Sequence, residues 1–196
     1  MLKNKLKQIW DENKASINGW ISIPNSFTAE AMSKMGWDSL TVDLQHGLNS
    51  YETSIPIIQS ISHNTIPLAR VPWNDPGIIM KMLDLGVLGI IAPMINNKKD
   101  CEKFVSYCRY PPLGQRSFGP IQAQLKYGGE YFEKANENII CIAMIETKEA
   151  VKNLDEILSV PTLDGVYIGP ADMSISYGLK PKFDITEDPI IENESN

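Results

Sequence analysis

Six short apolar runs alternate with segments of helical character, and this alternation constrains the fold more than any other feature of the chain. No hairpin dipeptide such as Asn-Gly joins one run directly to the next, so neighbouring runs are not expected to pair antiparallel. Alternating strands and helices are typical of a parallel sheet built from βα units. The runs are Trp20–Ile23, Ser39–Leu44, Ile66–Val71, Gly89–Ala92, Ile139–Ile145 and Val166–Ile168.

The segments between the runs carry helix start and stop signals. Ser26 or Thr28 is expected to cap a helix that Gly36 ends, and Asp75 with Pro76 is a strong start signal for another. Tyr110–Gly129 is rich in Gly and Pro and is expected to be a long functional loop. Helices are predicted over the first dozen residues, Ser26–Met35, Tyr51–Ser62, Pro76 to about Gly86, Lys98–Arg109, Glu130–Ala135, and between the fifth and sixth strands.

Polar residues at the strand ends favour a barrel over an open sheet. Neither GxGxxG nor GxxxxGK occurs, so a nucleotide-binding sheet loses support. His46, Arg70, Glu146 and Asp172 follow or end four different strands. Convergence from many strands is typical of a (β/α)8 TIM barrel. We therefore expect one α/β domain over residues 1–196, with about six of eight βα units, two open sheet edges and no further strand after Gly178.

Charge and cysteine content exclude several classes of partner. The net charge is -6, which leaves no basic surplus for nucleic acid or an anionic membrane. The three cysteines lack CxxC spacing, so neither a disulfide framework nor a zinc site is indicated. No window is long and apolar enough to span a membrane, and the first residues do not resemble a secretory signal. A reducing cytoplasm is the expected compartment.

Two acids follow the last two apolar runs. Glu146 comes directly after Ile139–Ile145, and Asp172 comes shortly after Val166–Ile168. Carboxylates at the carboxyl ends of neighbouring parallel strands can hold a hydrated divalent cation. Each acid can equally be a helix-start residue, stabilised by the helix dipole. The sequence leaves both interpretations open.

Three other features can carry chemistry at the same end of the sheet. His46 is a candidate base with Asp43 three residues before it, although a lone histidine is more often structural. Arg70 is expected either to pair with an acid or to meet an anionic ligand. The backbone N–H groups of Gly169–Asp172 can cradle a carboxylate or phosphate, or simply form a strand-to-helix turn.

The chain resembles the HpcH/HpaI family of metal-dependent 2-keto acid aldolases. The resemblance rests on the order and spacing of VDLQHG, RVPWNDPGIIMKMLDLG, APM, RYPPLGQRSFGP, MIET and DGVYIGPADMS. It implies a (β/α)8 barrel, a hexamer of domain-swapped units, and carbon–carbon bond chemistry beside the carbonyl of pyruvate or a related 2-oxo acid, with an aldehyde as the second substrate.

The resemblance also implies a role for each matching residue. Glu146 and Asp172 would be ligands of Mg2+, Mn2+ or Co2+. Arg70 would contact the keto or enolate oxygen, and His46 would be the general base. The remaining matches are Asp84 as the acid that orients His46, Asp43 in the same network, and Gly169, Ala171 and Asp172 around the substrate carboxylate.

Two positions depart from the family pattern. Gln45 stands where these aldolases carry Glu before the histidine, and Met144 stands where they carry Gln before the metal-binding Glu. Relatives are also expected to continue through two more strand–helix units. The leading hypothesis is a lyase acting on a small 2-oxo acid. A truncated, inactive assembly subunit and a phosphate-binding barrel isomerase are the alternatives.

Overall fold

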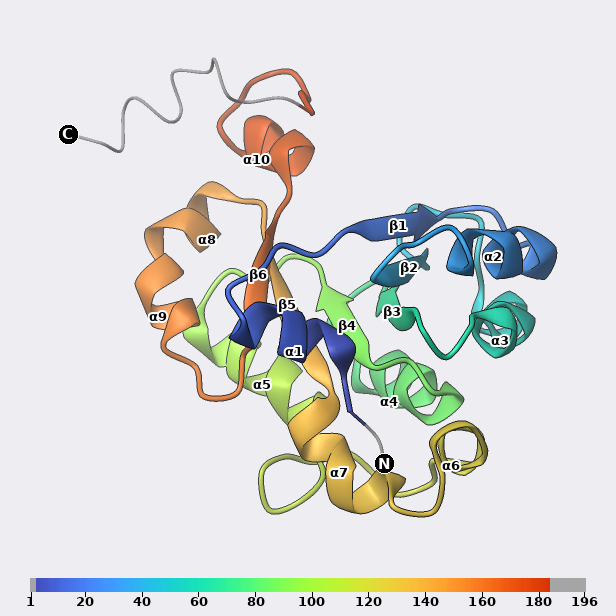
Figure 1. Ribbon diagram of the computed structural model, residues 1–196. Coiled ribbons are helices and arrows are strands. Elements are labelled where there is room, and N and C mark those ends of the chain that lie inside the picture. The colour runs from blue at the N-terminus through green and yellow to red at the C-terminus, as the bar shows by residue number, and fades with distance from the viewer. Residues whose placement is uncertain (1–2, 184–196) are drawn as a thin grey trace.

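In the computed structural model, six parallel strands form one sheet in sequence order (Figure 1). The structure describes residues 3–183. Every strand end lies within two residues of its predicted position, and the parallel α/β prediction is confirmed. The strands are β1 Asn18–Ile21, β2 Ser39–Asp43, β3 Ile66–Arg70, β4 Gly89–Ala92, β5 Ile140–Ile145 and β6 Gly165–Ile168.

The sheet is curled into a half-barrel. β1 and β6 are its two edges, yet the rings of Trp20 on β1 and Tyr167 on β6 lie 5.8 Å apart between centroids. Two outermost strands of a flat six-stranded sheet would be separated by about 24 Å, at the usual strand spacing. The concave face therefore turns the two edges toward each other. In residues 3–183 no backbone ladder closes β1 onto β6.

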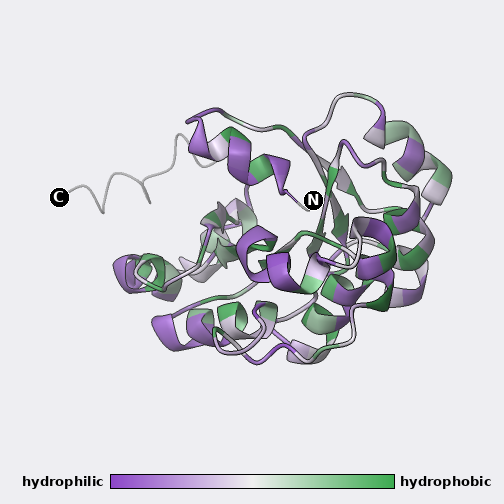
Figure 2. Cartoon of the chain, turned by 60° about the horizontal axis from the view of Figure 1, so that its bottom comes forward, coloured by the Kyte–Doolittle hydropathy of each residue, from purple (hydrophilic) through white to green (hydrophobic). Residues whose placement is uncertain are grey.

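Helices cover the convex face of the sheet, and their apolar residues turn toward the strands (Figures 1 and 2). β2 is buried along its whole length, as expected for a strand of a parallel sheet. The helices are α1 Lys5–Asp11, α2 Ser26–Ser33, α3 Tyr51–Ser60, α4 Pro76–Leu85, α5 Lys98–Cys108, α6 Ile121–Tyr127, α7 Tyr131–Asn138, α8 Lys148–Lys152, α9 Leu154–Leu158 and α10 Pro170–Ser176.

Side-chain caps fix most of the helix starts. Asp75 accepts hydrogen bonds from Gly77 N and Ile78 N, and Pro76 opens α4, as predicted. Helix α2 corrects one prediction, because its cap is Asn25 rather than Ser26 or Thr28. The Asn25 side chain accepts from Thr28 N at 2.9 Å. Asn25 lies one position before Ser26, and asparagine is among the strongest capping residues.

The segment Tyr110–Gly129 is shorter as a loop than predicted, because α6 occupies Ile121–Tyr127. Its N-cap residue, Pro120, makes no side-chain cap hydrogen bond, and the helix buries only Ala123. It has neither a capping signal nor a broad apolar stripe, so the sequence pattern does not predict it. Packing against α4 stabilises it instead. The region between β5 and β6 likewise divides into two short helices, α8 and α9.

Polar contacts tie the amino ends of the strands together. The side chain of Asn4 donates to the carbonyls of Leu88 and Asn138, which fixes the start of α1 below β4 and β5. Asp164 accepts from Lys7 at 2.7 Å and from the buried Arg109 at 3.2 Å. These contacts stabilise the amino end of the half-barrel. They do not involve the carboxyl ends of the strands, where the candidate site lies.

Three further expectations bear on the described part of the chain. No helix within residues 3–183 is long and apolar enough to cross a membrane. Cys101, Cys108 and Cys141 are free and buried. The expectation of a strand-free tail after Gly178 lies mostly in residues 184–196, outside the described residues.

Candidate functional site

Asp43 and Arg70 form a bidentate ion pair at the carboxyl ends of β2 and β3. The sheet register places them as direct neighbours, so their side chains leave the same face. Arg70 Nε donates to Asp43 Oδ1 at 2.8 Å, and Nη2 donates to Oδ2 at 2.6 Å. Both side chains are nearly buried, with 12% and 3% of their surface exposed. Arg70 was expected either to pair with an acid or to meet an anionic ligand, and the structure shows that it pairs with an acid.

Trp20 completes this cluster from β1. Its indole Nε1 donates to Asp43 Oδ2 at 3.2 Å, and the Arg70 guanidinium lies 4.9 Å from the centre of its ring. Burial alone would raise the pKa of Asp43. Hydrogen bonds from Arg70 and Trp20, and the charge of Arg70, outweigh burial and lower that pKa below its usual range. Asp43 is therefore a fixed anion that holds Arg70 in position.

The turn after β2 presents His46. Asp43 Oδ1 accepts from the backbone N–H of Gln45 at 3.1 Å and of His46 at 3.3 Å, which sets the course of the turn. The imidazole of His46 is exposed and makes no hydrogen bond with residues 3–183. Gln45 departs from the family pattern, and its buried Oε1 has no partner in the described chain. The ring of His46 is thus exposed beyond the carboxyl end of β2, without a hydrogen-bond partner in residues 3–183.

Glu146 is a buried acid directly after β5. Only 1% of the residue is exposed, and its Oε1 accepts from the backbone N–H of Met94 at 2.7 Å. Met94 has a φ of 56°, a left-handed conformation that is uncommon outside glycine and that frequently marks functional sites. Gly169 packs on the other side, where an added Cβ would lie 2.7 Å from Glu146 Oε2. The surrounding backbone is therefore shaped around this carboxylate.

The charges of Asp172, Arg70 and His46 all act on the Glu146 carboxylate. Burial raises the pKa of Glu146, and the charge of Asp172 raises it further. The Met94 N–H, Arg70 and His46 act in the opposite direction. Groups from β3, β5, the turn after β2 and helix α10 therefore share one electrostatic environment at the carboxyl ends of the strands.

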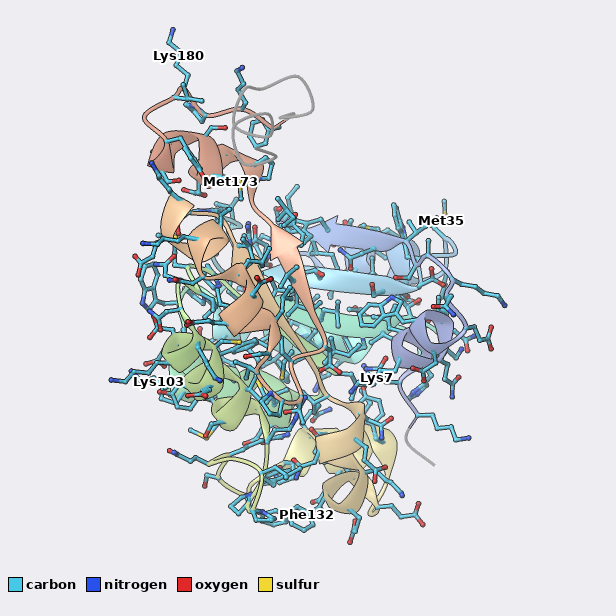
Figure 3. The ribbon with its side chains drawn as sticks, turned by 90° about the vertical axis from the view of Figure 1, so that its left-hand side faces the viewer. Lys7, Met35, Lys103, Phe132, Met173 and Lys180 are labelled. Atoms are coloured by element: carbon cyan, nitrogen blue, oxygen red, sulfur yellow. The ribbon has the colours of Figure 1, made fainter. Side chains whose placement is uncertain are left out.

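Asp172 lies in the first turn of α10, which stands above the strand ends (Figure 1). Figure 3 shows Met173 of this helix at the end of the molecule opposite Phe132 of α7. The expected backbone cradle is smaller than predicted, because Gly169 N already donates to Ile145 O at 3.1 Å. Pro170 has no N–H. Only the amides of Ala171 and Asp172 remain available from the segment Gly169–Asp172.

The donor set fits a divalent cation held by two carboxylates. Glu146 is a nearly fully buried acid whose only hydrogen-bond donor in the described chain is one neutral amide. Burying a carboxylate without a cation is costly. Asp172 provides a second carboxylate nearby, and within residues 3–183 no set of three or more His, Cys, Asp or Glu is gathered for a metal. Two carboxylates suit a hydrated Mg2+ or Mn2+ rather than zinc.

Asp84 has a different partner from the one expected. Its Oδ1 accepts from Arg116 Nη2 at 2.7 Å, and Arg116 is fully buried against the ring of Tyr110. Asp84 lies in the last turn of α4, which leads to the amino end of β4, whereas His46 follows the carboxyl end of β2. The described fold therefore does not bring Asp84 to His46 within one chain, and the orienting role predicted for it is not supported there.

Three site residues escaped prediction from the residues alone. Trp20 and Tyr167 line the concave face, and Met94 contributes a backbone N–H. Trp20 gave a signal as the one aromatic residue in the first apolar run. The role of Met94 rests on its backbone conformation, which residue type does not reveal.

A curled parallel sheet with acids, an arginine and a histidine at its carboxyl ends defines a barrel-type α/β enzyme. The family model for HpcH/HpaI aldolase/citrate lyase matches residues 17–188 of this chain. The chain belongs to the HpcH/HpaI aldolase/citrate lyase family. The resemblance read from the sequence motifs is thereby confirmed.

Named relatives agree with this assignment. A hydroxypyruvate/pyruvate aldolase of Rhizorhabdus wittichii is 39% identical over 189 residues, covering 96% of this chain and 75% of the relative. A 4-hydroxy-2-oxo-heptane-1,7-dioate aldolase of Shigella flexneri is 35% identical over 181 residues, covering 90% and 68%. The family and these relatives support a carbon–carbon lyase, and an inactive assembly subunit is not favoured.

Solved structures agree on the fold. An HpcH/HpaI aldolase/citrate lyase family protein from Burkholderia cenocepacia superposes with a TM-score of 0.88 at 25% identity, covering 98% of this chain and 78% of that one. The citrate synthase SbnG gives a TM-score of 0.84 at 31% identity, covering 97% and 74%. The half-barrel therefore superposes on about three quarters of each of these two solved chains.

Proposed function

We propose that the protein is a metal-dependent aldolase that cleaves or forms 4-hydroxy-2-oxo acids, with pyruvate or a close analogue as one substrate and an aldehyde as the other. The observation that carries the proposal is the buried Glu146 carboxylate, which shares one electrostatic environment with Asp172, Arg70 and His46. The names of the relatives support the substrate class.

We further propose that the six strands belong to one domain of (β/α)8 type that assembles as a homo-oligomer. The approach of Trp20 to Tyr167 supports closure, because the sheet already curves enough to bring side chains of its two edge strands together. The half-barrel also leaves Tyr167 and Ile168 of β6 partly exposed, at 37% and 49%. Exposed edge residues of this kind favour pairing with a further strand. The free, buried cysteines support a reducing compartment.

Glu146 and Asp172 would hold the cation, with Mg2+, Mn2+ and Co2+ as the proposed ions. The bound ion would supply Lewis-acid polarisation of the 2-oxo acid. The two carboxylates provide the negative charge that keeps it in place. Met144 places a thioether, 2% exposed, where the family pattern has an amide, so Glu146 and Asp172 would be the side chains that hold the ion.

Arg70 stabilises negative charge as it develops on the substrate oxygen. Its Nε and Nη2 are bound by Asp43, so the guanidinium is fixed before substrate arrives. Nη1 makes no hydrogen bond with residues 3–183, and it remains available to donate. Preorganised positive charge of this kind is usually the largest contribution to such a reaction.

His46 moves the proton at the carbon beside the carbonyl. The Asp43 carboxylate fixes the backbone of its turn, and the exposed imidazole reaches the mouth of the half-barrel. The amides of Ala171 and Asp172, at the start of α10, bind the substrate carboxylate. In this proposal Arg70 supplies positive charge, the amides of Ala171 and Asp172 bind the substrate carboxylate, and His46 transfers the proton.

Exchange of the methyl protons of pyruvate in D2O tests the donor half of the reaction without an aldehyde. Proton NMR should show exchange with Mg2+ or Mn2+ and none after chelation. Glu146→Gln should abolish it, whereas Glu149→Gln, an exposed acid of α8, should leave it unchanged. Exchange that persists under chelation and in Glu146→Gln would overturn the proposal. Cleavage of a 4-hydroxy-2-oxo acid tests the complete reaction.

A further inference from the structure

A second pocket lies at the amino end of the half-barrel, opposite the candidate site. Its cavity volume is about 210 Å³. It lies between Ile66 at the start of β3, Leu88 just before β4, the start of α1 and the end of α6. The lining residues are Lys3, Lys5, His63, Ile66, Leu88, Lys126 and Tyr127.

The pocket gathers positive charge in an acidic protein. Three lysines and a histidine line it with no aspartate or glutamate, although the chain carries a net charge of -6. None of the three lysines forms an ion pair within residues 3–183. Grouped cations without counterions repel one another, and an anion bound among them would remove that repulsion.

Lys126 is the most enclosed of these cations. Its Nζ donates to Ile58 O at 2.7 Å, which occupies one of its three N–H donors. Burial lowers the pKa of Lys126 to about 8, so its ammonium group lacks the solvation that water or an anion would give. The adjoining Tyr127 is anchored by its hydroxyl to Gly86 O at 2.7 Å and forms a firm wall.

The other polar groups of the pocket lie on exposed side chains. Lys5 Nζ donates to Asn64 Oδ1 at 3.1 Å, beside His63 in the turn before β3. Lys3 and His63 are exposed. The pocket therefore combines the partly buried Lys126 with two exposed lysines and an exposed imidazole, beside the apolar side chains of Ile66 and Leu88.

We propose that this pocket binds a small polyvalent anion, a phosphate or a short dicarboxylate, at a site separate from the candidate active site. The volume suits a ligand of a few heavy atoms, and the lysines supply several N–H donors without competing acids. The proposal does not depend on the aldolase activity, because the residues of the two sites are distinct.

Calorimetry with inorganic phosphate and with malonate tests the proposal on the full chain loaded with magnesium. We expect binding of at least one probe with a Kd below about 1 mM. Lys3→Gln with Lys5→Gln should weaken it roughly tenfold or more. The matched control is Lys14→Gln with Lys34→Gln, two exposed lysines elsewhere, which changes the net charge equally. Equal weakening by both pairs would overturn the proposal.

The two histidines of the chain report where the anion binds. In protein labelled with 13C-histidine, phosphate should shift the His63 signal and leave that of His46 unchanged. Glu146→Gln should retain phosphate binding, which separates this site from the proposed metal site. A shift confined to His46, or binding so weak that neither signal moves at about 10 mM, would show that no anion site exists here.

Discussion

The Asp43–Arg70 pair gives the sharpest quantitative prediction, through the substitution Asp43→Asn. The carboxylate accepts five hydrogen bonds, from Trp20, Gln45 N, His46 N and twice from Arg70. Asparagine keeps one oxygen and replaces the other with an NH2 group. If Oδ1 keeps its position, the NH2 group would face the donors of Trp20 and Arg70.

The expected cost follows from the burial of both partners. Breaking a buried ion pair by removing one charge costs about 3–5 kcal/mol. Arg70 keeps 12% exposure and its contact with Trp20, and asparagine retains some hydrogen bonds, so we expect the lower end, about 3 kcal/mol. For a chain of this size that corresponds to a fall in Tm of roughly 6–12 °C.

Thermal and urea unfolding, followed by circular dichroism, measure the effect. A cycle with Arg70→Met isolates the pair, and the double variant should lose clearly less stability than the sum of the two single variants. The lowered pKa of Asp43 adds a pH signature. Its contribution is complete above the usual aspartate range and is lost as pH falls through the folded pKa, so the deficit of Asp43→Asn should shrink below about pH 4. A deficit below about 0.5 kcal/mol with no coupling would refute this reasoning.

Three further predictions concern the metal pair and the thiols. Gly169→Ala should reduce Mn2+ affinity about tenfold or more, because the added methyl group would displace the Glu146 carboxylate. Gly165→Ala is the control, since an added Cβ there meets nothing within 4 Å, and it should leave the affinity unchanged. Equal Mn2+ affinities of the two variants would contradict the packing argument. Because the pKa of Glu146 is raised, protons should compete with Mn2+ from above the usual glutamate range near pH 4–5, and calorimetry across pH would show no such loss in Glu146→Gln. The buried thiols should react with Ellman's reagent only after denaturation, and rapid reaction of the native protein would contradict their burial at Cys101, Cys108 and Cys141.

Much of the fold was predictable because it depends on local and periodic signals. Apolar runs separated by helical segments specify parallel strands, and Asp75 with Pro76 specifies the start of α4. Helix α6 was missed for a physical reason: it lacks a cap and an apolar stripe and is stabilised by packing against α4. Asp84 shows the limit of residue-by-residue transfer, because its neighbour in the chain's own fold is Arg116.

The sequence by itself determined which residues reach the carboxyl ends of the strands, since position after an apolar run sets that end. His46, Arg70, Glu146 and Asp172 follow from this rule. Only the tertiary structure decided how they are held, because register, curl and backbone conformation depend on contacts between distant segments. The pairing of Asp43 with Arg70 comes from the β2–β3 register, and the amide that binds Glu146 comes from the left-handed backbone of Met94. The cationic pocket at the other end likewise joins α1, α6 and the turn before β3, which no local pattern connects.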